Sequence, residues 1–351
     1  MAQLKSNKTF IFNCVFIAML ILPNAIMFTG LSYIITNPKD FPSIKSSLKD
    51  FKEFYSDSFG LKTGLTNKYL SFKSDILNEN PIPNRVIKGN NGWYFLGNYH
   101  NNILNDTFGN DKVSIEELES ISSNINDINT YLNSKNIKFY LVVAPNKSHI
   151  YPEHLPFQLN KNPNKLEQLK EYLKKEIDFE IIDPSESLLQ NKNQRQLYYK
   201  SNTHWNDFGA YIGYSYATDK INQSFPIPKT QLSNFSSKTY PLNEEDITKM
   251  INIHTNETSQ FFTKQNSSVV ADSLSFSFQH YLNPDVPYKL LMHRDSFAVG
   301  LIPFFNESFG ETIYTRGYTL DKDLIEKEQP NVVIFEIVER NLVQALSLLE
   351  K

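Results

Sequence analysis

Two segments of the chain are nearly continuous runs of apolar residues, many of them β-branched. Ile137–Ala144 is followed directly by Pro145, and Asn331–Val338 lies near the end of the sequence. A strand that is covered on both faces has such a run, whereas a half-exposed strand alternates apolar and polar residues. The first run therefore predicts a buried strand of a parallel sheet, and the second predicts a further strand.

Helix and strand signals alternate along most of residues 81–351. Ser114 and Glu117 fit a capping box and predict a helix that continues to about Leu132. Further helices are predicted at 166–176, at 207–221 and from about 297 and 340, and further strands at 93–96, 179–183, 290–292 and 312–314. The alternation predicts an α/β domain with a mainly parallel sheet flanked by helices. Residues 223–287 are rich in Ser, Asn and Thr, fit this alternation poorly, and are interpreted as an insertion or cap.

The N-terminal region carries a long uncharged segment. No charged residue lies between Lys8 and Lys39, and about 20 apolar residues are enough to cross a bilayer. A cleaved signal peptide is the alternative, but the run is long and has no clear cleavage site of small residues. We therefore predict a single transmembrane anchor at 1–36, a helical stalk at 37–80, and one domain at 81–351.

Composition excludes several classes of protein. With 40% hydrophobic residues, 26 Phe and 19 Tyr among 351 residues, the chain can bury a core and is not a disordered protein. A net charge of −3 argues against nucleic acid as a partner. Cys14 is the only cysteine and the seven histidines show no metal-ligand spacing, so neither a disulfide nor a metal site is predicted. No nucleotide-binding motif is present, and no cofactor is predicted.

Two short segments could carry chemistry. Ser296 lies at the junction of a predicted strand and helix, where a side chain projects from the carboxyl edge of a sheet and backbone N–H groups are unpaired. His204 lies just before another predicted helix and could act as the base that a serine nucleophile requires. Taken alone, a serine in the position of Ser296 is more often a helix N-cap, and a histidine in the position of His204 is more often a packed or surface residue.

Five short segments match the motifs of one family in the same order. They are Asp57–Lys62, Gly89–Leu96, Pro145–Pro156, Thr203–Ala210 and Arg294–Phe297. Within them, Thr203-His204-Trp205-Asn206 is similar to a D-T-H-W-N motif, and Arg294-Asp295-Ser296-Phe297 is similar to G-D-S-F. On these residues the chain resembles the alginate O-acetyltransferase family, the AlgX/AlgJ-like branch of the SGNH hydrolase-like proteins.

The resemblance implies a fold, a location and an activity. Members carry an SGNH-like α/β domain on the periplasmic side of the cell inner membrane and transfer acetyl groups to hydroxyls of an exported polysaccharide. The acetyl donor is supplied by a separate multi-pass membrane acyltransferase. Carried over to this sequence, the nucleophile is Ser296, the base is His204, and Asn202 occupies the position of the family aspartate.

Three positions qualify this expectation. Asn202 can accept a hydrogen bond from the imidazole but cannot stabilise imidazolium by charge, so another carboxylate could serve; Asp207 is the local candidate. Arg294 stands where the family often has Gly and could bind an acidic sugar or form a surface ion pair. Lys147, after a predicted strand, could also contact substrate. A polysaccharide acetylesterase on the same fold and a non-catalytic polysaccharide-binding or assembly factor remain alternatives.

Overall fold

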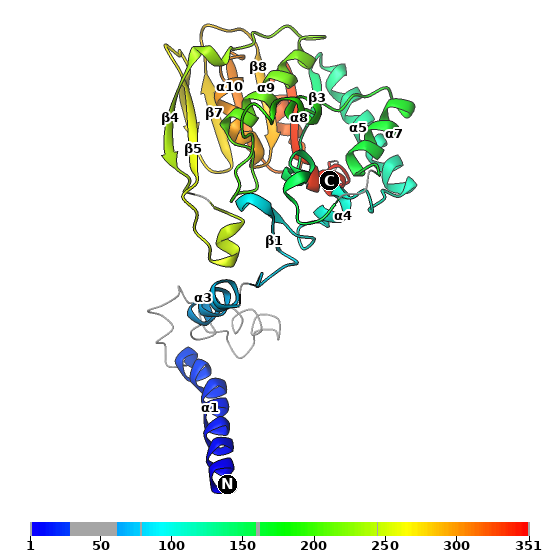
Figure 1. The fold of residues 1–351 in the computed structure, drawn as a ribbon. Helices are drawn as coiled ribbons and strands as arrows, with labels where there is room; N and C mark the ends of the chain where they lie inside the picture. The colour runs from blue at the N-terminus through cyan, green and yellow to red at the C-terminus, as the bar shows by residue number, and fades with distance from the viewer. Residues whose placement is uncertain (1, 29–61, 78, 159–161, 244, 350–351) are drawn as a thin grey trace. The chain divides into compact units, whose positions relative to one another are not determined.

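The computed structural model describes residues 2–28, 62–77, 79–158, 162–243 and 245–349 (Figure 1). The chain divides into two units, Met1–Pro81 and Ile82–Lys351. Residues 37–61 of the predicted stalk, and the Asp57–Leu61 part of the first family motif, lie outside the described residues.

In the described part of the first unit, the regular secondary structure is helical. Helix α1 spans Ala2–Phe28, α3 spans Lys62–Ser71, and a π-helix continues over Phe72–Ile76. Among the residues that the structure describes, no helix combines the length and the apolar character that a membrane span requires. The transmembrane anchor therefore stays a prediction.

A six-stranded sheet organises the second unit, in the order β3-β10-β8-β9-β7-β6. Four of its strands run parallel, and the last two pair antiparallel, so the sheet is mixed. The parallel strands are β3 (Lys138–Ala144), β10 (Val332–Val338), β8 (Lys289–Arg294) and β9 (Glu311–Arg316), and the antiparallel ones are β7 (Phe278–Leu282) and β6 (Val270–Leu274).

Helices cover both faces of this sheet (Figure 1). Alternate residues of β8 show the arrangement, because Leu291 packs in one buried cluster and Leu290 and Met292 pack in the other. The first cluster includes α5 (Ile115–Ser134), α7 (Lys165–Glu176), α11 (Lys322–Glu328) and α12 (Leu342–Leu346), and the second includes α4 (Ile103–Thr107), α6 (Lys147–Ile150), α8 (Ser185–Asn191), α9 (Asp207–Ile221) and α10 (Ile302–Phe305). The apolar runs of β3 and β10 are therefore buried on both sides, as the sequence predicts.

Smaller elements surround the sheet. A hairpin joins β1 (Val86–Lys88) to β2 (Tyr94–Leu96), and a second antiparallel pair joins β4 (Phe235–Pro241) to β5 (Thr258–Lys264). The segment at 223–287 thus contains four strands, and two of them, β6 and β7, extend the main sheet.

Some of the helices and strands predicted from local sequence signals are present in the structure and others are not. The capping box of α5 is present, with the Glu117 N–H donating to Ser114 Oγ at 3.2 Å and the Ser114 N–H donating to Glu117 Oε2 at 3.0 Å. The predicted strand at 179–183 is wrong, because only Ile182 forms a bridge, to Val142, before Pro184 turns the chain into α8. The helix predicted from Phe297 is a 3-10 turn, Phe297–Gly300, followed by the short α10.

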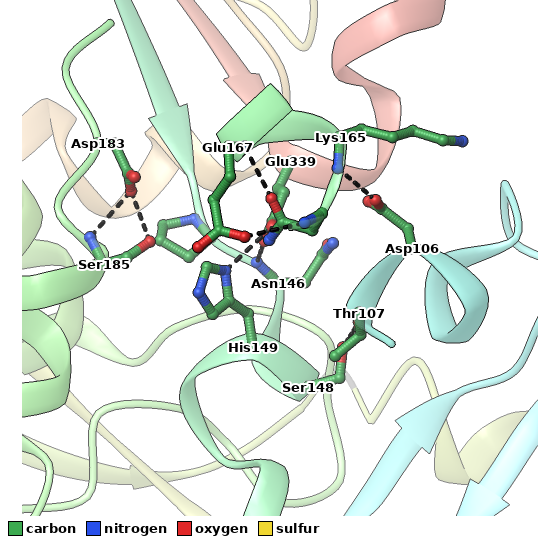
Figure 2. A network of polar contacts seen from close by, with 12 residues as sticks. Asp106, Thr107, Asn146, Ser148, His149, Lys165, Glu167, Asp183, Ser185 and Glu339 are labelled. Carbon is green, nitrogen blue, oxygen red and sulfur yellow. Dashed lines mark hydrogen bonds and ion pairs between the residues drawn. The ribbon is translucent and has the colours of Figure 1, made fainter. Parts of the chain in front are cut away.

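A buried polar network joins the loops that follow β3 and β10 (Figure 2). Glu339, just past β10, accepts hydrogen bonds from the Asn146 N–H at 2.7 Å and from the Asn164 side-chain amide at 2.9 Å. Its Oε1 also lies 3.0 Å from His149 Nδ1. Burial lowers the pKa of the His149 imidazole, but the Glu339 carboxylate outweighs that effect and raises the pKa to about 9.

The His149–Glu339 pair should make stability depend on pH. A histidine with a folded pKa of about 9, against its usual 6.5, stabilises the fold fully below pH 6.5 and loses this contribution as the pH rises through 9. We expect the full chain to have a higher free energy of unfolding than His149→Gln. This difference between the two proteins should be about 3 kcal/mol larger at pH 6 than at pH 9.5. Denaturant titrations at the two pH values measure this, with the exposed His254→Gln as control. An equal difference at both pH values would contradict the assignment.

Candidate active site

Ser296 and His204 meet at the carboxyl edge of the sheet. Ser296 follows β8 and begins the turn Phe297–Gly300, while His204 lies shortly before α9. His204 Nε2 lies 2.8 Å from Ser296 Oγ, within hydrogen-bonding distance. The imidazole also packs against the ring of Phe297, with 4.6 Å between centroids. The two segments are 92 residues apart in sequence, so tertiary folding alone creates this pair.

Asp295 fixes the turn that carries Ser296. Its Oδ1 accepts the Phe297 N–H at 2.7 Å and its Oδ2 accepts the Val338 N–H at 2.7 Å, which attaches the turn to the end of β10. The Asp295 N–H donates to Glu336 Oε2 at 3.1 Å. Burial and the Asp295 carboxylate raise the pKa of Glu336 well above its usual range. Asp295 therefore holds the backbone of the turn that carries Ser296.

Asn202 orients the imidazole of His204. Its Oδ1 lies 2.8 Å from His204 Nδ1 and accepts the His204 backbone N–H at 2.9 Å. The backbone bond fixes which end of the Asn202 amide faces the ring, and an amide oxygen can only accept. Nδ1 therefore carries the proton, and Nε2 is left with its lone pair toward Ser296. This is the tautomer that a general base needs.

Lys147 supports the His204 loop from inside the fold. Its Nζ donates to the carbonyl oxygens of Tyr199 at 3.1 Å, Lys200 at 3.1 Å and Asn202 at 2.8 Å. The residue is only 4% exposed, and burial lowers the pKa of its ammonium group to about 7. The expected substrate contact is therefore corrected: all three donors of Lys147 are directed at the loop, and the side chain positions Asn202 instead.

Two carboxylates from the segment 223–287 hold the same loop from the other side. Asp246 Oδ1 accepts the Thr203 N–H at 2.8 Å. Glu257 accepts the N–H groups of Lys200 at 2.7 Å and Ser201 at 2.9 Å. The sequence pattern did not identify either residue, because Asp246 ends a run of three acidic residues, Glu257 stands alone, and neither belongs to a recognisable motif in this polar stretch.

Trp205 joins the histidine segment to the serine segment. Its indole Nε1–H donates to the carbonyl oxygen of Phe297 at 2.9 Å. The chain packs so closely here that a Cβ on Gly209 would lie 2.2 Å from the Leu197 carbonyl oxygen and 3.0 Å from Trp205 Cβ. The Trp and Gly of the motif around His204 therefore have a structural role: they set the approach of the base to the nucleophile.

An open pocket of about 880 Å³ contains the Ser296–His204 pair. Its walls come from α9, the turn after β8, and the strands β5 and β7 of the segment 223–287. Arg294 forms part of the wall but is only 2% exposed, with Nη2 donating to Gln279 Oε1 at 2.9 Å and Nη1 donating to the Asp295 carbonyl at 3.1 Å. Arg316 also lines the pocket and is exposed, with its guanidinium 4.2 Å from the centre of the Phe276 ring.

Asp207 lines the same pocket at the first turn of α9. Burial raises the pKa of its carboxyl to about 7, so a large part of it is protonated at neutral pH and it is a poor source of negative charge for the histidine. Within the part of the chain that the structure describes, no group of three or more His, Cys, Asp or Glu side chains could hold a metal ion.

Residues 86–277 match the family model described as "SGNH hydrolase-like domain, acetyltransferase AlgX", which is more than half of the 351 residues. The chain belongs to this family. The matched part of the AlgX-type domain includes Asn202 and His204 and ends before Ser296, so the assignment of the nucleophile rests on the geometry of the pocket.

Solved structures support the SGNH-like fold of this AlgX-type domain. Bacillus cereus PatB1, in a structure with a sulfonyl adduct, is 20% identical with a TM-score of 0.54, covering 68% of this chain and 93% of PatB1. A DHHW family protein from Eubacterium siraeum is 15% identical with a TM-score of 0.54, covering 76% of this chain and 99% of that protein. None of the curated proteins matches the chain.

Proposed function

We propose that this chain is an O-acetyltransferase that acetylates hydroxyls of an exported cell-surface polysaccharide through an acyl-serine intermediate. The observation that carries the proposal is the 2.8 Å contact between Ser296 Oγ and His204 Nε2, with Asn202 holding the opposite ring nitrogen. A serine hydroxyl is a weak nucleophile until a correctly oriented base takes its proton. Membership of an acetyltransferase family makes acetyl transfer the reaction that this pair serves best.

The reaction proceeds in two halves. In the first, His204 Nε2 takes the Ser296 proton while Oγ attacks the acetyl carbonyl, and the imidazolium returns the proton to the departing donor group. The Ser296 backbone N–H contributes to stabilising the oxyanion. In the second half, His204 takes a proton from a sugar hydroxyl, whose oxygen attacks the acyl-serine, and the proton returns to Ser296 Oγ.

The pocket favours an acceptor that bears negative charge. Arg316 offers an exposed guanidinium, and Arg294 adds a buried positive charge beside Ser296. Phe261 and Phe276 line the pocket with exposed rings, on which a sugar face could pack. We therefore propose a carboxylate-bearing sugar as acceptor, with Arg316 making the direct contact and Arg294 acting through its charge and through Gln279.

The location and partners form part of the same proposal. The uncharged run between Lys8 and Lys39 supports a single-pass anchor in the cell inner membrane, with the domain in the periplasm. The acetyl group would then come from a multi-pass membrane acyltransferase that delivers it across the bilayer.

Product analysis tests the transferase activity. The full chain in detergent micelles is incubated with p-nitrophenyl acetate, either alone or with an acidic or a neutral oligosaccharide. We expect acetylated oligosaccharide by mass spectrometry, more with the acidic than with the neutral acceptor, and a transient acetyl group on Ser296. Release of acetate alone in all three samples would indicate an esterase, and turnover equal to that of Ser296→Ala would indicate a non-catalytic protein.

A further inference from the structure

The negative charge that the family motif places two residues before its histidine comes, in this chain, from a different segment. We infer that Asp246 supplies this charge and stabilises the protonated form of His204 through Thr203. The inference rests on the proposed function, because it assigns a positioning residue to the same catalytic pair.

Three distances place Asp246 at the histidine. Asp246 Oδ2 lies 3.8 Å from His204 Nδ1 and accepts the Thr203 hydroxyl proton at 2.6 Å. Thr203 Oγ1 lies 3.1 Å from His204 Nδ1. A hydroxyl has one proton, and Thr203 directs it at Asp246, so toward Nδ1 the hydroxyl oxygen can only accept. The Nδ1–H therefore faces the neutral side-chain oxygens of Asn202 and Thr203, and the Asp246 carboxylate lies behind the Thr203 hydroxyl.

Negative charge at this position favours the reaction. When Ser296 gives up its proton, the imidazole becomes a cation, and a neutral Asn202 orients that cation without stabilising it by charge. An opposite charge within about 4–6 Å favours the charged form of a titrating group. The side chain of Asp246 is 37% exposed, so solvent weakens this effect without removing it.

Asp246 is held in place independently of the imidazole. Its Oδ1 accepts the Thr203 N–H at 2.8 Å, while Oδ2 is the oxygen that faces the hydroxyl. Three further charged or titratable groups interact electrostatically with Asp246: Lys147, Arg340 and His100. The charge thus sits in a fixed geometry between a buried lysine, a buried arginine and the catalytic histidine.

A titration of His204 tests the inference without using catalysis. In the full chain with ¹⁵N-labelled histidine, in micelles, the His204 signals are assigned by their loss in His204→Gln. We expect Asp246→Asn to lower the pH midpoint of the His204 titration by about one pH unit, and the exposed Asp127→Asn to leave it unchanged. An unchanged midpoint in Asp246→Asn overturns the inference.

Should Asp246→Asn fail to fold, Thr203 provides the second pair of variants. Thr203→Ser keeps the hydroxyl bridge and should retain the midpoint, whereas Thr203→Val removes the bridge and should lower it. Equal midpoints in these two variants would equally overturn the inference.

Activity gives a readout that a purely structural role would not produce. We expect Asp246→Asn to lower kcat for p-nitrophenyl acetate about tenfold, corresponding to the change of one pH unit in the midpoint. Introducing Asn202→Asp into Asp246→Asn should restore kcat, because it places a carboxylate beside His204 Nδ1 again. Absence of this rescue counts against the inference. If Ser296→Ala retained turnover, the proposed function would fail while the titration result would still stand, so the two failures are distinguishable.

Discussion

Ser296→Ala is expected to lower turnover of an acetyl ester by about 10⁴-fold or more, and His204→Ala by a similar factor. The reason is that neither residue works alone: the hydroxyl needs the base 2.8 Å away, and formation of the acyl-enzyme needs the hydroxyl on which that base acts. The double variant should therefore be no less active than the single ones. Release of p-nitrophenol by the full chain in micelles measures all three.

A matched control is available on the far side of the domain. Ser123 on α5 is exposed, and Ser123→Ala should retain full turnover. The fold of each variant is checked by denaturant titration, since loss of the half-buried Ser296 hydroxyl should change stability little. If Ser296→Ala kept wild-type turnover, Ser296 would be removed from the mechanism.

Lys147→Met is expected to destabilise the protein by about 3–5 kcal/mol and to abolish ester turnover. Three carbonyl oxygens of the His204 loop lose their donor, and the carboxylates of Asp246 and Glu257 lose a nearby cation. The loop would then relax, and Asn202 could no longer hold the imidazole. Denaturant titration and ester turnover measure the two effects.

The comparison with an exposed lysine makes this test specific. Lys88 on β1 is exposed, and Lys88→Met should change stability by less than about 0.5 kcal/mol. Lys147→Met with the stability and turnover of the wild type would show that the carbonyl contacts do not support the site.

The elements that the sequence predicted well are those whose signal is local. The apolar runs of β3 and β10 and the capping box of α5 depend on neighbouring residues, and α9 begins and ends where its pattern predicts. The segment 223–287 lacked such signals because every residue of β6 is exposed and β7 is mostly half-buried, so no apolar run marks either strand. These are the two strands of the main sheet that the sequence did not predict.

The residues of the candidate site also fall into two groups, those that a local motif indicates and those that only tertiary contacts reveal. Ser296 and His204 were identified because each lies in a motif whose neighbours, Asp295 and Trp205, have structural roles of their own. Lys147 was misinterpreted because its place after β3 suits a substrate contact, whereas its long side chain turns inward to the loop carbonyls. Asp246 and Glu257 could not be predicted, because their function arises from contacts with residues 43 to 57 positions away.

The loop 199–204 takes most of its shape from residues outside it. Three of its carbonyl groups accept hydrogen bonds from Lys147 at the start of α6, and three of its N–H groups donate to carboxylates that follow by more than forty residues. In a growing polypeptide the histidine is made before those carboxylates, and the serine later still. The Ser296–His204 site can therefore form only after the last third of the chain has been synthesised and has folded against the rest of the domain.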